Sequence, residues 1–208
     1  MKNARKKKPW EELSEEEKQE IRESWKVKLP DKFDIFCEGD LILDDFSSIH
    51  FPGNVYVSHG DFVSRNIVVD GDFYVDGSVD AYDIDVGGDF TVNSYVDAFV
   101  INVTGDFIAH DYVQYECVNV TGNFIVDGNV AVSGTDIPDH INVGGNFTIA
   151  GDIDSKDIYV YGDFTSKGHH ISCHKLNVYG VFSIACGVWL VTNGHPMRIG
   201  MSITSEDK

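Results

Sequence analysis

The residues best suited to chemistry in this chain include a short cluster of histidines around a cysteine. His169, His170, Cys173 and His174 lie within six residues, and these residue types can bind a transition metal. The apolar residues of this segment fall on alternate positions, which predicts that Cys173 points inward while His170 and His174 point outward. At 3.3 Å per residue these two histidines would lie about 13 Å apart, too far to share one tetrahedral ion. We therefore expect a core cysteine beside surface histidines, with no metal and no cofactor.

Aspartates recur at fixed spacing and form two columns. One column contains Asp72, Asp89, Asp106, Asn123, Asn146 and Asp163, and the other contains Asp80, Asp97 and Asp154. The structural interpretation is that Asp and Asn satisfy backbone groups at turns. The functional interpretation is a row of carboxylates that imitates nucleic-acid phosphates and contacts a basic protein. The candidate protein-interaction residues are Asp72, Asp80, Asp89, Asp97, Asp106, Asp136, Asp139 and Asp163.

These residues belong to a repeat. A Gly-Asp/Asn-Phe step begins at Gly71 and recurs at spacings of 17, 17, 17, 23, 17 and 18 residues, the last copy being degenerate. Such regularity identifies a repeat architecture in which each unit packs on its neighbours. Its aromatic positions are Phe73, Phe90, Phe107, Phe124, Phe147, Phe164 and Phe182.

The unit of the repeat has the period of a β-strand. Between Ile84 and Val92, the large apolar residues and one glycine fall on every second position. A helical repeat is excluded because Gly, Asn, Asp and Thr are abundant. Seventeen residues then make one coil, with short strands bent at Gly and Asp/Asn corners and equivalent positions stacked about 4.8 Å apart. We expect an all-β, single-domain β-solenoid (β-helix) of about eight 17-residue coils with an interior phenylalanine column.

A further outward column is rich in asparagine. It contains Asp85, Asn102, Asn119, Asn142, Tyr159 and Asn177. Asparagine amides at equivalent positions of stacked strands can hydrogen-bond to one another along the stack. Three matches to the glycosylation sequon fall on repeat positions, and we interpret them as part of the repeat.

The N-terminal segment, residues 1–32, is predicted to be a basic tail followed by a capping helix. Ser14 and Glu17 have the spacing of a capping box at the start of a helix over residues 9–27. Open solenoid ends expose strand edges, so we expect this α-helix to cover the first coil. A tail that binds nucleic acid or a membrane is the alternative for its lysines.

The remaining chain divides into the β-solenoid, residues 33–187, and C-terminal cap strands with a tail, residues 188–208. Six additional residues interrupt the period and predict an outward loop at 133–140. In the terminal segment, Trp189 and Leu190 lie in an apolar run without Asp or Asn corners. They are the candidate end-to-end contacts between two copies.

Composition and charge restrict the function classes. The 208 residues suffice for one domain, and the absence of an 18-residue apolar run predicts no membrane span. The basic N-terminus without a following apolar stretch predicts no secretory signal, and four scattered cysteines favour a reduced, cytoplasmic protein. Residues 33–208 hold 26 acidic and six basic residues, which disfavours direct nucleic-acid binding by the solenoid. Because P-loop, GxSxG and HExxH motifs are absent, we expect no enzyme.

The unit Ile-x-Val-x-Gly-Asp-Phe-x-Val-x-Gly-x-Val-Asp-Ala, residues 67–81, resembles the coils of bactofilin-like, polymer-forming solenoids. The resemblance extends over residues 49–186 and implies end-to-end stacking into cytoskeletal filaments without a nucleotide. It leads to the hypothesis of a non-catalytic β-solenoid that acts as a structural or protein-interaction module and self-assembles as a scaffold. The alternative is an acidic inhibitor of the phage anti-defence type, a nucleic-acid mimic that binds a basic nucleic-acid-binding protein.

Overall fold

The structure of the chain is a computed structural model. It describes residues 33–43, 48–132, 139–185, 189–192, 198–199 and 203–206, with the backbone alone from residue 189 onward. The chain divides into two compact units, Met1–Lys32 and Phe33–Lys208, and the second contains all the described residues. The predicted basic tail, the capping helix over 9–27 and Asp136 lie outside the described residues.

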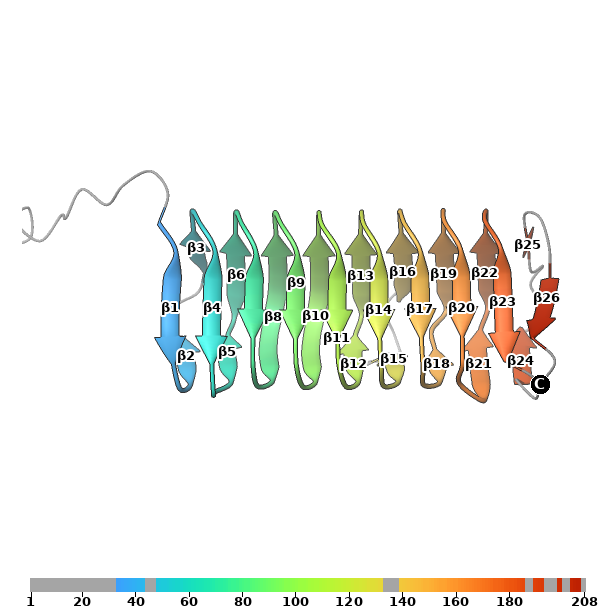
Figure 1. Cartoon of the computed structure of the whole chain (residues 1–208), viewed down its shortest axis with the longest axis horizontal. Helices are drawn as coiled ribbons and strands as arrows, with labels where there is room; N and C mark the ends of the chain where they lie inside the picture. The colour runs from blue at the N-terminus through green and yellow to red at the C-terminus, as the bar shows by residue number, and fades with distance from the viewer. Residues whose placement is uncertain are drawn as a thin grey trace, which may run out of the picture. The chain divides into compact units, whose positions relative to one another are not determined.

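One side of this unit is a ten-stranded sheet in which every neighbouring pair is parallel (Figure 1). Its strands, in spatial order, are β1 (Ile35–Glu38), β4 (Val55–Ser58), β7 (Phe73–Val75), β9 (Phe90–Val92), β11 (Phe107–Ala109), β14 (Phe124–Val126), β17 (Phe147–Ile149), β20 (Phe164–Ser166), β23 (Phe182–Ala185) and β26 (Ile203–Glu206). Consecutive members are successive turns of the chain, so the spatial order equals the order in the sequence. This is the arrangement expected of a solenoid.

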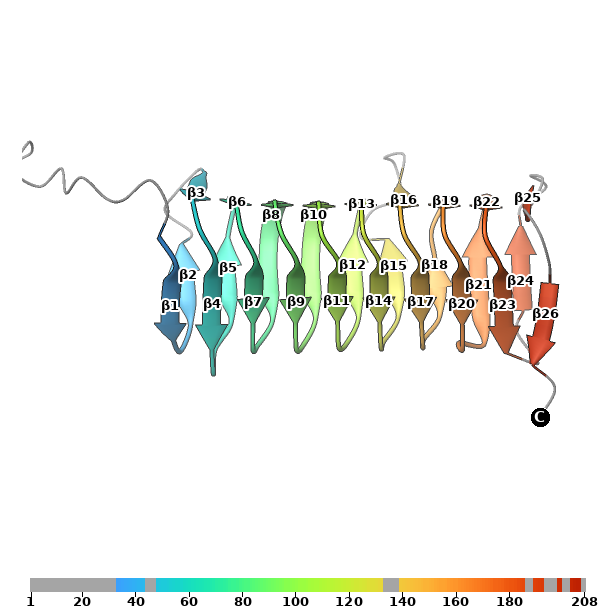
Figure 2. The ribbon, with the colours of Figure 1, turned by 45° about the horizontal axis from the view of Figure 1, so that its top comes forward.

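The second sheet has 16 strands in two rows, with β8 (Val79–Val86) and β10 (Val96–Val103) running through both. The first row also contains β2 (Leu41–Leu43), β5 (Phe62–Ser64), β12 (Val113–Tyr115), β15 (Val130–Val132), β18 (Ile153–Asp154), β21 (His170–Cys173) and β24 (Trp189–Thr192). The second row also contains β3 (Ile49–Phe51), β6 (Asn66–Val69), β13 (Cys117–Val120), β16 (His140–Val143), β19 (Asp157–Val160), β22 (Lys175–Val178) and β25 (Arg198–Ile199). Each turn therefore passes through the ten-stranded sheet, the first row and the second row (Figure 2).

The core lies between these three rows of strands. The strand Phe90–Val92 buries its first and last residues and leaves Thr91 partly exposed, as period two requires. The predicted phenylalanine spine is confirmed, since all seven side chains are buried. Its members also contact one another, and the rings of Phe90, Phe107 and Phe124 stack at centroid distances of 4.8 and 4.9 Å. Cys173 is also buried, as predicted.

The predicted all-β solenoid of about eight turns is confirmed, and all regular elements of the described residues are strands. The register continues across the six-residue insertion, because Tyr115 pairs with Val132 and Cys117 pairs with His140. The loop itself lies outside the described residues except for Asp139 and His140. The C-terminal stretch continues the same stack, since Phe182 pairs in parallel with Ile203.

Candidate interaction surfaces

The first predicted column of carboxylates lies at the corner that leads into the ten-stranded sheet. There Oδ1 of Asp72 accepts the backbone N–H of Asp89 at 2.9 Å, and Oδ1 of Asp89 accepts that of Asp106 at 2.8 Å. Oδ1 of Asp106 accepts the backbone N–H of Asn123 at 2.7 Å, and the same bond links Asp163 to Val181. Each side chain thus satisfies a backbone donor of the next turn, which confirms the structural interpretation of this column.

Glycine is required at this corner because successive turns approach closely. A Cβ atom on Gly105 would collide with Oδ1 of Asp89 and with the backbone of Gly88. The Gly-Asp step of the repeat therefore has a physical origin: the glycine leaves room for the aspartate of the preceding turn, and that aspartate accepts the following N–H.

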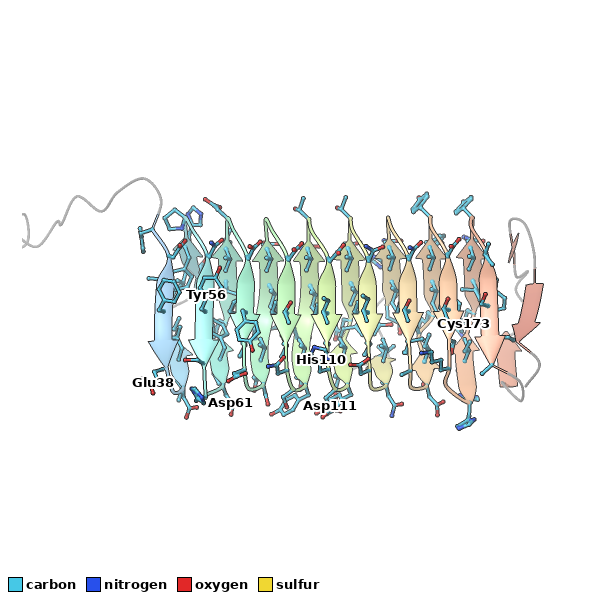
Figure 3. The ribbon with its side chains drawn as sticks, viewed as in Figure 1. Glu38, Tyr56, Asp61, His110, Asp111 and Cys173 are labelled. Carbon is cyan, nitrogen blue, oxygen red and sulfur yellow. The ribbon has the colours of Figure 1, made fainter. Side chains whose placement is uncertain are left out.

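At the corner that follows the ten-stranded sheet, aspartates also accept backbone N–H groups of the next turn, but at less regular positions. Oδ1 of Asp61 accepts the backbone N–H of Ser78 at 2.6 Å, and Oδ1 of Asp152 accepts those of His169 and His170, each at 2.8 Å. These bonds lower the pKa of Asp152, so its carboxylate is ionised at neutral pH. Figure 3 shows Asp61 and, farther along the same edge, Asp111.

The second predicted column lies on the first row of the sixteen-stranded sheet. Asp80 and Asp97 are direct partners of adjacent parallel strands. Burial raises the pKa of Asp97, and the neighbouring charge of Asp80 raises it further. Toward the C-terminus the same register position holds Gln114 and then Ala131. Two acidic neighbours, rather than a continuous row, therefore occupy this column before Asp154.

The two columns do not share a side of the solenoid. A turn passes from the ten-stranded sheet to the first row, then to the second row, and only then reaches the corner of Asp72. The first row, which holds Asp80 and Asp97, is thus the one row that does not adjoin that corner. The predicted carboxylates are consequently divided between separate surfaces.

Asp139 is a predicted interaction residue, but its side chain is buried and not available at the surface. The residue is 4% exposed, and its Oδ1 accepts the backbone N–H of Lys156 at 3.1 Å, with the Lys156 ammonium 3.9 Å away. Burial raises the pKa of Asp139, and the charge of Lys156 opposes this effect. Asp139 therefore holds one turn to the next beneath the surface.

The predicted asparagine ladder is present. Nδ2 of Asn102 donates to Oδ1 of Asp85 at 2.7 Å, and the chain of amide bonds continues through Asn119 to Asn142 at 2.9 Å per step. Asn177, predicted to point outward in the same column, is instead 7% exposed. The ladder fixes the register of the second row over four turns.

The structure also brings together a cysteine and a histidine that the sequence analysis did not pair. Sγ of Cys117 lies 3.1 Å from Nε2 of His140, and Nδ2 of Asn119 donates to the same sulfur at 3.3 Å. Cys117 and His140 are 23 positions apart because the insertion lies between them, so the regular 17-residue spacing conceals their contact. Burial raises the pKa of the Cys117 thiol, which disfavours a reactive thiolate.

The segment 169–174 has its cysteine in the core, as the alternation of apolar residues predicts. Across the described residues, no three side chains of His, Cys, Asp or Glu are placed to hold a metal ion. Cys173 is enclosed in the core, where burial raises the pKa of its thiol to about 11 (Figure 3).

The candidate end-to-end contacts lie in the last strand of the first row. Trp189 pairs with His170 and Leu190 with Ile171, so β24 forms part of the terminal turn. At the other end, the ten-stranded sheet begins with β1, which pairs with β4.

A search for relatives found no matching family model, no matching curated protein and no matching solved structure. In the described part of the chain, no helix has the length and apolar character to cross a membrane.

Proposed function

We propose that this protein is a non-catalytic scaffold whose solenoid extends by end-to-end stacking of further copies. The observation that supports the proposal is the uniform direction of the ten-stranded sheet, which begins at β1 and ends at β26 with every pair parallel. A second copy in the same orientation can continue this sheet, because its β1 presents the hydrogen-bonding pattern that comes after β26.

The first strand directs alternate backbone groups toward the N-terminal edge of the sheet. The backbone N–H groups of Ile35 and Gly39 donate to Asn54 and Ser58 of the next turn, each at 2.8 Å. In a parallel ladder the alternate residues, Phe36 and Glu38, direct their N–H groups to the other edge. No strand of the described residues pairs with that edge. Such an edge favours the addition of another strand.

The test uses a proline at this edge. Phe36→Pro removes an outward N–H without removing a bond to β4, and Phe36→Thr is the matched control that loses the ring but keeps the N–H. We expect the unmodified protein and the threonine variant to form particles that lengthen with concentration, measured by light scattering after size exclusion and by negative-stain microscopy. The proline variant should remain short while keeping its β-sheet circular dichroism. Short particles for the unmodified protein at every concentration would contradict the proposal.

Trp189 and Leu190 belong to the same proposal, as contacts at the opposite end. Replacing both by serine should shorten the particles as the proline does, and mixing this variant with Phe36→Pro should not restore growth. Particles of unchanged length would remove these two residues from the proposed contact.

The acidic inhibitor is the less supported alternative. A nucleic-acid mimic needs its carboxylates along one surface, whereas Asp72 and Asp80 represent columns on separate surfaces. The carboxylates of the first column also hold backbone donors of the next turn. A salt-sensitive complex with a basic nucleic-acid-binding protein, lost when Asp80 and Asp97 become asparagine, would support the inhibitor instead.

A further inference from the structure

The outer surface of the ten-stranded sheet has a column of side chains without charge. The second residue of each strand points outward, and the nine described positions of this column are Phe36, Tyr56, Tyr74, Thr91, Ile108, Ile125, Thr148, Thr165 and Ser183. Beside this column, β1 also exposes Glu38. We call this column the neutral strip. Figure 3 shows Tyr56 on this face.

The neutral strip contrasts with the rest of the unit. Residues 33–208 hold 26 acidic and only six basic side chains, and both other outward columns contain aspartates, such as Asp80 and Asp85. A charge-free strip of nine turns on such a body is therefore the surface on which two copies repel each other least.

We propose that a second copy of this chain packs its neutral strip against this one, with the two solenoids side by side and antiparallel. This pairing is independent of end-to-end stacking, since it uses the face of the ten-stranded sheet and not its edges.

The size of the face suits a dimer. Ten strands about 4.8 Å apart and three residues wide give roughly 500 Å² per copy, or about 1,000 Å² in total. Specific protein interfaces begin near this total area. Because equivalent positions repeat at the strand spacing, the side chains of two such faces can interlock along their whole length.

The residue pattern fits a two-fold axis through the middle of the sheet. β11 and β14 are the fifth and sixth of the ten strands, so the axis places Ile108 of one copy against Ile125 of the other. These are the only aliphatic side chains among the nine described positions of the neutral strip, and they lie at its centre. Apart from Phe36 in the first strand, the other described positions carry hydroxyl groups, and apolar residues at the centre with polar residues around them are the usual order of an interface.

Two combinations of charged side chains on the rim after the strands are favourable, whereas Glu38 and Glu206 occupy equivalent positions of the first and last strands and form a like-charged pair. The same axis places β7 against β20, which brings Asp76 opposite Lys167, and it brings His110 opposite Asp127. The backbone N–H of His59, 3.1 Å from Oδ2 of Asp76, lowers the pKa of this carboxyl group and keeps it ionised. Nδ1 of His110 already lies 2.7 Å from Oδ2 of Asp127 within one copy. The axis would therefore bring together two histidines and two aspartates, one of each from each copy.

The rim where the chain enters the strands of the ten-stranded sheet is also compatible with this two-fold axis. There Asp89 faces Asn146 and Asp106 faces Asn123, each an acceptor against an amide. Among the described residues of this rim, Asp72 and Asp163 form the one like-charged combination, and both are exposed to solvent.

The test compares two double variants that add the same charge to the same turns. Ile108→Lys/Ile125→Lys places lysines at the centre of the neutral strip, whereas Gln114→Lys/Ala131→Lys places them on the first row. Sedimentation equilibrium of the full chain should show dimers for the unmodified protein and for the control, and at least tenfold weaker pairing for the strip variant. Lys167→Glu should weaken pairing as well, because it then faces Asp76.

Microscopy separates this pairing from end-to-end stacking, because lateral pairing doubles particle width and stacking increases length. Equal association of the two double variants would overturn the proposal, as would a single-width particle for the unmodified protein at about 100 μM. Circular dichroism of each variant establishes that the solenoid is folded in every comparison.

Discussion

At the residue scale, the aspartates of the repeat hold successive turns together, and any contact with a partner is an additional role. Oδ1 of Asp106 accepts both the backbone N–H of Asn123 at 2.7 Å and its side-chain amide at 3.0 Å. The other carboxylate oxygen is the one that could face a ligand. Loss of such an aspartate would therefore lower stability as well as binding, and the two effects need separate measurement.

We expect Asp106→Ala to lower the free energy of unfolding by about 1 kcal/mol, because a backbone donor loses its partner at a partly exposed corner. Asp106→Asn keeps the acceptor, as Asn123 and Asn146 do at the same position of later turns, and should cost less than about 0.5 kcal/mol. Urea unfolding followed by circular dichroism measures both values. Equal losses for the two variants would show that the charge, and not the hydrogen bond, supports this corner.

The sequence predicts which way most side chains point, but not how far they are covered. Period two correctly placed Phe107 and Cys173 in the core. It did not predict the burial of Asp139 and Asn177, because their exposure depends on the size of neighbouring side chains and on the insertion. The contact between Cys117 and His140 was missed for the same reason, since it joins residues across that insertion.

At the element scale, each strand is too short to be stable alone and depends on its neighbours. The strand Phe107–Ala109 has three residues and pairs with a parallel strand on either side. The ring of Phe107 stacks on Phe90 with an interplanar angle of 11° and makes the same angle with Phe124. The phenylalanine column therefore couples successive turns through their side chains, in addition to the backbone ladder.

We expect Phe107→Ala to destabilise the solenoid by about 4 kcal/mol, because it leaves a cavity at a fully buried position and interrupts the ring stack. Phe107→Leu fills most of the space and should cost about 1 kcal/mol. Thermal and urea unfolding of both variants provide the measurement. A loss of only about 1 kcal/mol for alanine would show that adjacent turns close the cavity.

The pairing of β8 with β10 predicts a pH dependence. Burial and the charge of Asp80 raise the pKa of Asp97 in the folded state, so the folded protein takes up this proton before the unfolded chain does. At pH values above the raised pKa of Asp97, the charged Asp80–Asp97 pair therefore lowers the free energy of unfolding. This loss disappears as the pH falls through that pKa. Asp97→Asn should raise the free energy of unfolding at pH 7 by about 0.5 kcal/mol, and by less near pH 4. A gain that is equal at both pH values would exclude this origin.

The end of the solenoid has a weaker sequence signature than its middle. The repeat signature weakens at Gly180-Val181-Phe182, and the next turn has Ile203 at the phenylalanine position. The sequence predicts cap strands for 188–208, and the described backbone of this segment forms β24, β25 and β26, which pair with the preceding turn. Backbone hydrogen bonds between turns do not require the side-chain signature by which the turns are recognised.

At the scale of the whole molecule, net charge opposes every form of self-association. The chain has a net charge of −18 and a sequence pI of about 4.5. Stacked or paired copies bring like charges together, whereas a complex of an acidic inhibitor with a basic protein brings opposite charges together. Salt therefore acts in opposite directions on the two proposed functions.

We expect self-association to strengthen at least several-fold between 50 and 500 mM NaCl at pH 7.5, because screening reduces repulsion between acidic bodies while the backbone and apolar contacts remain. Light scattering at fixed protein concentration measures the change. Bringing the pH toward 5 at low salt should act in the same direction, since it lowers the net charge. Association that weakens with salt would instead mean that attraction between opposite charges, such as Asp76 and Lys167 across the proposed dimer, outweighs the repulsion between the two acidic bodies.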